Sequence, residues 1–152
     1  MECTEVKRKL YAAYNKLLRN DRVLLELDVN ECSVTHKLAE YLQSESQEWH
    51  VDCEYIRDVD VPKQMKVQRV STDDEDAHTV FPDVIVHQRN TKNNLVVIEA
   101  KKSNSFRQSN DREKLKAYIA ENHYQVAFTV VFPVKSCASE ANSLTDITEV
   151  TA

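Results

Sequence analysis

Apolar residues recur at helical spacing in the first third of the chain. The pattern predicts an amphipathic helix over residues 4–19, with lysine and arginine between the apolar positions. Residues 22–28 fit either a short helix or a strand. Asn30 is a suitable N-cap for a second helix, predicted over 31–43. The apolar stripe of that second helix comprises Val34, Leu38 and Leu42.

The middle of the chain carries patterns typical of β-strands. Residues 50–56 predict one strand by alternation. Two β-branched runs, 80–87 and 95–101, surround an Asn-rich turn and predict a β-hairpin. A helix over 108–121 and a strongly apolar strand over 124–132 follow.

The hairpin strands and the strand after them are apolar on both parities, so both faces of their sheet need cover. We therefore expect an α/β fold, an α/β/α sandwich around a mixed sheet of roughly four to five strands. We expect residues 1–135 to form its single domain. Residues 57–79, with their acidic run, predict a solvated loop, and the Ser/Thr/Glu-rich residues 136–152 predict a loose C-terminal tail.

The composition excludes several kinds of protein. The chain has 152 residues and no glycine, which excludes the glycine-rich loops that cradle phosphates. Turns that need positive φ must then use asparagine or aspartate. None of the four cysteines forms a C-x-x-C pair, which argues against a zinc site. Neither a membrane-spanning run nor a signal segment is evident, so we expect a cytoplasmic protein without a membrane contact.

The net charge of −5 argues against a protein built mainly as a basic surface for nucleic acid. Its distribution is uneven. Residues 51–80 hold four Lys/Arg against eight Asp/Glu, a local charge of −4. Residues 81–121 hold eight Lys/Arg against five Asp/Glu, a local charge of +3. The central segment is therefore the part of the chain that repels a phosphate backbone least.

Three ionisable residues share one face of the predicted hairpin. Side chains two apart in a strand point the same way, so Asp83, Glu99 and Lys101 lie on one face. A loop centred on residue 91 or 92 places Asp83 across from Glu99 or Lys101. Two partly buried carboxylates at this spacing repel each other, and a divalent cation between them offsets the repulsion. The alternative is an exposed salt bridge between Lys101 and one acid, at the frayed end of the hairpin.

Mg²⁺ prefers carboxylate and carbonyl oxygens and leaves positions for a substrate phosphate. Asp83, Glu99 and the backbone carbonyl of Ala100 supply such ligands. The Lys101 ammonium could orient or help deprotonate a nucleophile, or stabilise charge on phosphorus. Glu31 falls inside the apolar stripe of the second helix, near its start. It either stabilises the helix dipole or points at the sheet and binds the metal through water.

Pro82-Asp83 and, after fifteen intervening residues, Glu99-Ala100-Lys101 resemble the PD-(D/E)xK signature of the restriction-endonuclease-like nuclease superfamily. The resemblance covers roughly residues 30–132. It is closest to small uncharacterised bacterial members, through Asn30-Glu31-x-Ser33-x-Thr35-His36 and Phe81-Pro82-Asp83-Val84-Ile85-Val86-His87.

The resemblance implies a restriction-endonuclease-like fold and hydrolysis of phosphodiester bonds, most often in DNA. It implies that Asp83 and Glu99 bind Mg²⁺ or Mn²⁺, that Lys101 is catalytic, and that Glu31 is the acid of the preceding helix. Some members of the superfamily act on RNA, and some have lost activity.

Further residues could contact nucleic acid. Lys102, Arg107 and Gln108 follow the signature and could track phosphates or reach the site. The other basic residues of the helix over 108–121, Lys114 among them, are assigned mostly to its solvated face. The acidic balance and small size also fit a non-catalytic nucleic-acid-binding or protein-assembly module that keeps the nuclease fold. A homodimer would suit either function, because two sites can cut both strands of a duplex.

Overall fold

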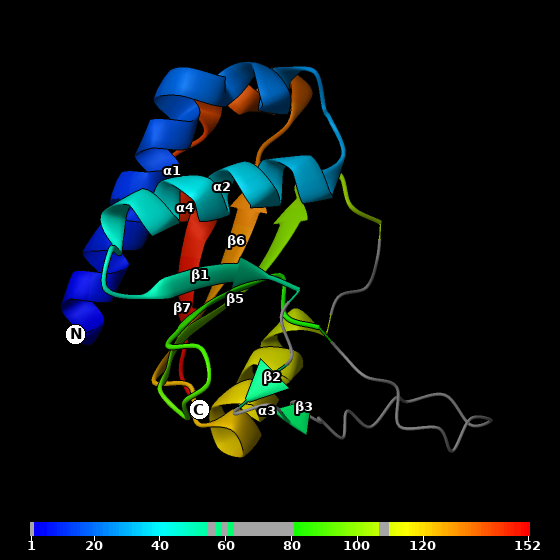
Figure 1. Cartoon of the computed structure of the whole chain (residues 1–152). Helices are drawn as coiled ribbons and strands as arrows, with labels where there is room; N and C mark the ends of the chain where they lie inside the picture. Colours follow the sequence, from blue (N-terminus) through cyan, green and yellow to red (C-terminus); the bar gives the residue numbers. More distant parts are fainter. Residues whose placement is uncertain (1, 55–56, 59–60, 63–80, 107–109) are drawn as a thin grey trace, which may run out of the picture.

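The computed structural model describes residues 2–54, 57–58, 61–62, 81–106 and 110–152 (Figure 1). Five strands form one mixed sheet in the order β1-β4-β5-β6-β7. Their bounds are β1 His50–Cys53, β4 Val84–His87, β5 Asn94–Lys102, β6 Val126–Phe132 and β7 Ile147–Val150. The helices are α1 Cys3–Glu26, α2 Glu31–Glu45, α3 Asp111–Asn122, the 3-10 helix η1 Lys135–Glu140 and α4 Ser143–Asp146. A separate two-stranded ribbon pairs β2 Arg57–Asp58 with β3 Val61–Pro62.

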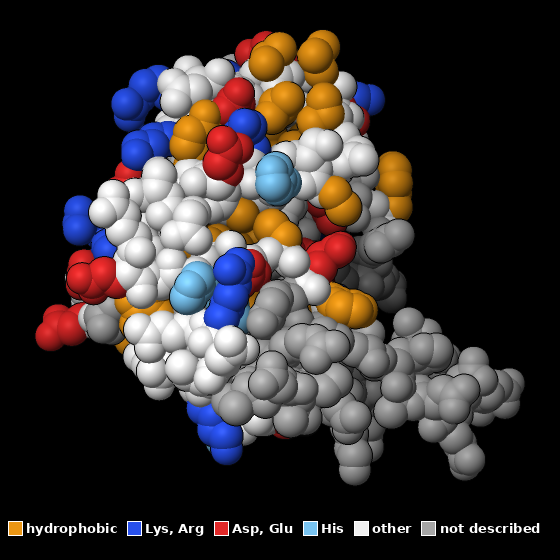
Figure 2. Space-filling model, viewed as in Figure 1, with side chains coloured by type: hydrophobic (Ala, Val, Ile, Leu, Met, Phe, Trp, Pro, Cys, Tyr) orange, Lys and Arg blue, Asp and Glu red, His pale blue; other side chains and the backbone are white. Residues whose placement is uncertain are grey.

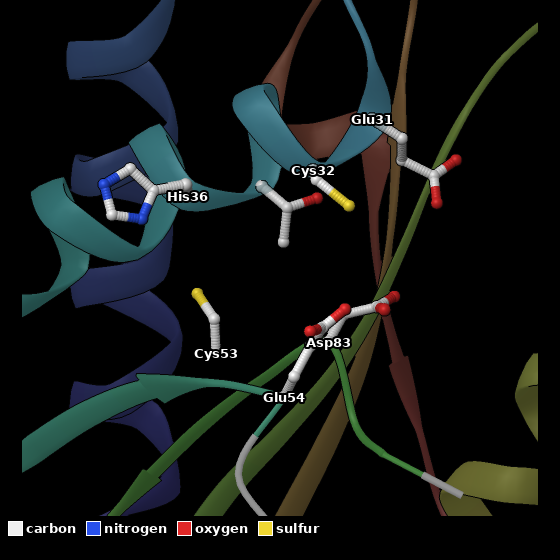
Figure 3. A pocket seen from close by; sticks show the side chains of 7 residues that line it. Glu31, Cys32, His36, Cys53, Glu54 and Asp83 are labelled. Atoms are coloured by element: carbon white, nitrogen blue, oxygen red, sulfur yellow. The ribbon is translucent and has the colours of Figure 1, made fainter.

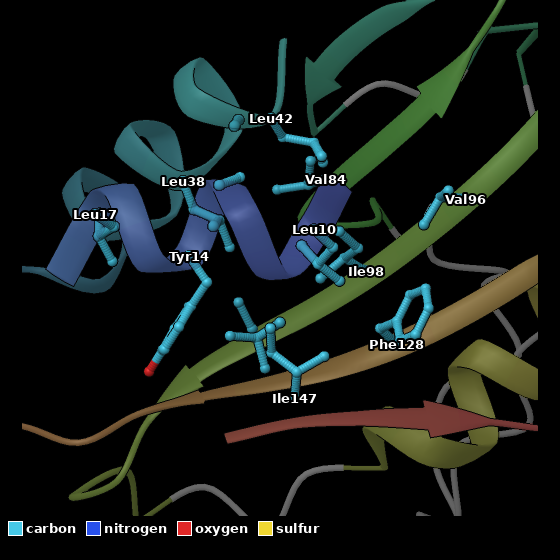
Figure 4. Packing of buried hydrophobic residues seen from close by; sticks show 14 of the residues in the cluster. Leu10, Tyr14, Leu17, Leu38, Leu42, Val84, Val96, Ile98, Phe128 and Ile147 are labelled. Atoms are coloured by element: carbon cyan, nitrogen blue, oxygen red, sulfur yellow. The ribbon is translucent and has the colours of Figure 1, made fainter. Parts of the chain in front are cut away.

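The apolar faces of α1 and α2 form the larger core with one face of the sheet (Figure 4). Leu10 of α1 and Leu38 of α2 are buried there against Ile98 of β5. On the opposite face, α3 packs against Ile85 of β4 and Val97 of β5 in a smaller core. Ile98 and Val97 point to opposite sides, as strand alternation requires. Helices therefore cover both faces of the sheet.

The pairing of the strands confirms the predicted mixed sheet. β4 is antiparallel to β5, and β5 is parallel to β6. β1 and β7 form the two edges, each antiparallel to its neighbour. The hairpin is therefore central in the sheet, and strands on both sides fix its position.

The first helix is longer than the prediction over 4–19. It continues to Glu26 through a kink at Asp21, where φ is −133°, and so includes most of the ambiguous stretch 22–28. The predicted start of α2 is confirmed, because the Asn30 side chain accepts a hydrogen bond from the backbone N–H of Ser33 at 2.9 Å. Among the described residues, no helix has the length and apolar character needed to cross a bilayer.

The predicted loose tail over 136–152 is wrong. The chain forms η1, α4 and then β7, which pairs with β6 and extends the domain to Val150. Ile147 and Val150 are buried, and the Tyr14 hydroxyl of α1 donates to Asp146 at 2.7 Å. The middle of β7 is exposed, as expected for an edge strand, and this exposure hides the strand in the sequence.

Two boundaries in the acidic region also differ from the prediction. The strand predicted over 50–56 ends at Cys53, and residues 55–56 lie outside the described part of the chain. The loop predicted over 57–79 contains the β2–β3 ribbon, and residues 63–79 of it again lie outside the described part.

Without glycine, five described residues take positive φ: Asp28, Glu54, Asn90, His123 and Lys135. The prediction that asparagine or aspartate would occupy such positions holds for two of these five. His123, at φ 57°, closes the C-terminus of α3, a position that glycine ordinarily fills. Left-handed conformations at residues with a Cβ atom cost free energy, so packing elsewhere must offset that cost.

Candidate functional site

The candidate site lies at the end of the β4–β5 hairpin where the chain enters β4. The register pairs Val84 with Ile98, which places Asp83 directly across from Glu99. The Oδ2 atom of Asp83 accepts a hydrogen bond from the backbone N–H of Ala100 at 2.7 Å. This bond fixes the Asp83 carboxylate against β5, beside the Glu99 side chain.

Glu99 is a buried carboxylate, with 3% of the residue exposed. Its Oε2 atom lies 3.5 Å from the Lys114 ammonium of α3, and its Oε1 atom has no hydrogen-bond partner among the described residues. Burial and, secondly, the negative charge of Asp83 raise the pKa of Glu99 from 4.5 to about 8, although Lys114 opposes the shift. Without a cation, this side chain therefore holds a proton at neutral pH.

The pKa of Asp83 is also raised, chiefly because burial disfavours its charged form. The hydrogen bond from Ala100 and the charge of Lys114 oppose this rise, whereas the charge of Glu31 adds to it. Asp83 and Glu99 thus resist carrying two negative charges together.

Glu31 joins the site from the first residue of α2. Its Oε2 atom accepts a hydrogen bond from the backbone N–H of Lys102 at 3.3 Å. The Glu31 side chain therefore points at the sheet, which confirms one of the two orientations considered for it. A dipole interaction with the start of α2 remains compatible with this position.

A pocket of about 220 Å³ opens beside these acids, between the start of α2 and the end of β1 (Figure 3). Its lining comprises Glu31, Cys32, Thr35, His36, Cys53, Glu54 and Asp83. Figure 3 shows the Glu54 and Asp83 side chains close together on one side of the pocket, whereas the Glu31 side chain extends from the start of α2 toward the neighbouring strand. Asp83 therefore both lines the pocket and faces Glu99 across the hairpin, so a ligand in the pocket can reach this carboxylate.

Lys101 follows Glu99 by two residues in β5, so its side chain leaves the same face of the sheet. Lys101 is partly exposed, in contrast to the buried Glu99. An ammonium at the solvent edge of a carboxylate pair, of which Glu99 is buried and Asp83 half-buried, can approach a phosphate that enters from solvent.

The structure adds one residue that sequence reasoning had assigned to a solvated helix face. Lys114 of α3 approaches Glu99 at 3.5 Å and Asp111 at 3.9 Å. The sequence places Lys114 four residues before Tyr118, which is buried, and this spacing was the indication that Lys114 faces the sheet. Residues four apart lie on one side of a helix, so Lys114 lies at the border of the buried stripe.

Of the three residues predicted to contact nucleic acid, Lys102 is the one that lies in the described part of the chain. The Lys102 ammonium pairs with Asp28 at 2.9 Å and donates to the carbonyl oxygen of Val29 at 3.3 Å. These bonds tie the end of β5 to the turn between α1 and α2, so a phosphate would have to compete with Asp28 for this ammonium. Arg107 and Gln108 lie outside the described residues.

Within the described ranges, no three His, Cys, Asp or Glu side chains form a preassembled metal cluster. The donor set at Asp83 and Glu99 nevertheless fits a hard cation. The Oε1 atom of Glu99, which has no hydrogen-bond partner in the part of the chain that the structure describes, is a buried acceptor that an ion could satisfy. Carboxylate oxygens are also the ligands that Mg²⁺ and Mn²⁺ prefer.

Comparison with known proteins adds no relative to this picture. No protein-family model matches the chain. No curated protein and no solved structure is significantly similar to it. The functional assignment therefore depends on the residues of the site and on their motif.

Proposed function

We propose that this protein is a Mg²⁺- or Mn²⁺-dependent nuclease that hydrolyses phosphodiester bonds in nucleic acid, with DNA as the expected substrate. We further propose that its sheet and helices are a restriction-endonuclease-like fold. The observation that carries the proposal is the pairing of Asp83 with the buried Glu99, whose Oε1 atom lacks a protein partner among the described residues.

Asp83 and Glu99 would hold the cation, with the backbone carbonyl of Ala100 as a further ligand and Glu31 acting through water. The cation would supply charge neutralisation and polarise the scissile phosphate. The cost of bringing two acids together favours this function, because a bound cation removes both the repulsion and the unsatisfied acceptor.

Lys101 would position the attacking water or stabilise the charge that develops on phosphorus. Its place on the face of Glu99, nearer to solvent, suits a group that meets the substrate. Lys114 would act as a positioning residue, because it contacts Glu99 from α3 without sharing the strand.

Cleavage of labelled single- and double-stranded DNA and RNA with Mg²⁺ or Mn²⁺ tests the proposal. We expect metal-dependent cutting that Asp83→Ala and Lys101→Ala each reduce by about 10²-fold or more. Lys116→Ala, on the same helix as Lys114 but outside the site, is the matched control and should cut normally. Cutting at the wild-type level by Asp83→Ala and Lys101→Ala would refute the assignment.

A non-catalytic binding or assembly module is the second candidate function. The observation that favours it is the Lys114 ammonium, which already offers Glu99 a positive charge without a metal. Calorimetric titration with Mg²⁺ or Mn²⁺ separates the two functions, since absence of binding at millimolar metal would support the module. A homodimer remains part of both proposals, and sedimentation of the purified protein measures it directly.

A further inference from the structure

Two exposed phenylalanines lie on the chain segments next to the candidate site, one before β4 and one after β5. Phe106 is 101% exposed and Phe81 is 47% exposed, so much of each ring contacts solvent. Single exposed apolar residues are ordinary on protein surfaces and need no explanation. The position of this pair, on the two segments that leave the site, distinguishes it from the other exposed apolar residues.

The hairpin brings the two rings to the same end of the sheet. Phe81 precedes Asp83 by two residues, and Phe106 follows the last residue of β5, Lys102, by four. Because β4 and β5 are antiparallel, the start of β4 and the end of β5 lie toward the same end of the sheet, with β5 continuing from Ile98, the partner of Val84, to Lys102. The Ser105 N–H donates to the Lys102 carbonyl oxygen at 3.0 Å, which keeps the segment before Phe106 turned back on the strand end.

The remaining large exposed apolar residues lie elsewhere. Val23 and Leu27 are at the end of α1, where Figure 2 shows exposed hydrophobic side chains gathered. Leu144 is on α4, which packs against α1, β6 and β7 at the far edge of the sheet. Among the large exposed apolar residues of the described chain, Phe81 and Phe106 are thus the two on the segments that continue from the Asp83 and Glu99 strand ends.

We propose that Phe81 and Phe106 stack on unpaired bases, so that the substrate of this site is single-stranded nucleic acid. The inference rests on the proposed function for the class of ligand. A phenyl ring has no hydrogen-bonding group and cannot read a base edge or bind a phosphate. It binds the flat face of a base, and in a duplex the neighbouring base pairs already occupy that face.

The charge of the protein also favours a single-stranded ligand over a duplex. Binding to a duplex depends strongly on contacts between basic side chains and phosphates. The net charge here is −5, and Lys and Arg are scattered without a continuous stripe on the face shown in Figure 2. A ligand held partly by stacking needs fewer phosphate contacts, which suits this surface better than a duplex does.

Fluorescence anisotropy with a labelled single strand and the matching duplex, in EDTA to prevent cleavage, tests this inference. We expect the wild type to bind the single strand more tightly. Alanine at Phe106 or Phe81 should weaken that binding by about 5- to 150-fold, the range measured for loss of one stacked base. Phe106→Trp should retain binding and Phe106→Leu should not, because leucine is apolar without an aromatic face. Leu144→Ala is the control for loss of an exposed apolar side chain and should bind normally.

Equal or tighter binding of the duplex, unchanged by Phe106→Ala, would overturn the inference. Self-association that Phe106→Ala abolishes, without an effect on single-strand binding, would overturn it in favour of a contact between copies of the chain. Neither result affects the nuclease assignment, which depends on metal-dependent cutting and its loss in Asp83→Ala. Conversely, stacking-dependent binding without any cleavage would support this inference and remove the proposed function.

Discussion

The protonated state of Glu99 makes the clearest physical prediction. Its pKa is raised from 4.5 to about 8 by burial first and by Asp83 second. The folded protein then binds the Glu99 proton more tightly than the unfolded chain does. Stability from this group is therefore complete below pH 4.5 and is lost as the pH rises through about 8.

Glu99→Gln removes this dependence, because the amide cannot ionise. The difference between the folded and unfolded pKa of Glu99 implies that the free energy of unfolding of the wild type falls by about 2–3 kcal/mol from about pH 6 to pH 9 without metal. Over the same range, the free energy of unfolding of Glu99→Gln should gain this amount relative to the wild type. For a chain of this length the difference corresponds to about 4–12 °C in Tm.

Urea unfolding at several pH values in EDTA measures the effect. The single tryptophan, Trp49, packs partly buried against the core and supplies a fluorescence signal. The other ionisable groups are the same in both proteins, so their contribution largely cancels in the comparison. Lys114→Met should shift the fall in the free energy of unfolding to higher pH, because Lys114 lowers the pKa of Glu99. A stability difference between wild type and Glu99→Gln that stays constant with pH would refute the reasoning.

Three further changes test other parts of the account by thermal or urea unfolding without metal. Asp83→Asn should leave stability unchanged or raise it, because the amide oxygen can still accept from Ala100 and one charge is removed; a marked fall in Tm would contradict this. His123→Gly should raise stability by about 0.5–1 kcal/mol, since glycine adopts positive φ without the Cβ penalty, and a decrease would oppose this explanation. Asn30→Ala should cost about 1 kcal/mol through loss of the bond to Ser33, and an unchanged Tm would show that the cap contributes nothing.

The elements set by local pattern could be predicted from the sequence, and those set by distant packing could not. Asn30 and the stripe after it specify α2 within a few residues. β7 was missed because Ile147 and Val150 are its only buried positions, and the two residues between them are polar and exposed. Only the pairing with β6 makes this segment a strand.

The same distinction holds for the site. Asp83 and Glu99 could be placed together because alternation within a strand has a fixed period and the hairpin turn sets the register. The contact between Lys114 and Glu99 depends on how α3 crosses the sheet, which periodicity does not specify. The Lys102–Asp28 pair likewise depends on the turn at Asp28, where φ is 53°.

Calorimetric titration of the wild type with Mn²⁺ near pH 7, repeated in buffers of different ionisation enthalpy, addresses the central claim most directly. We predict binding at or below millimolar metal with release of close to one proton, because the cation must displace the proton that Glu99 holds. The binding should be lost in Asp83→Ala. Heat of dilution alone at millimolar Mn²⁺, or binding that Asp83→Ala leaves unchanged, would contradict a metal site at these two acids.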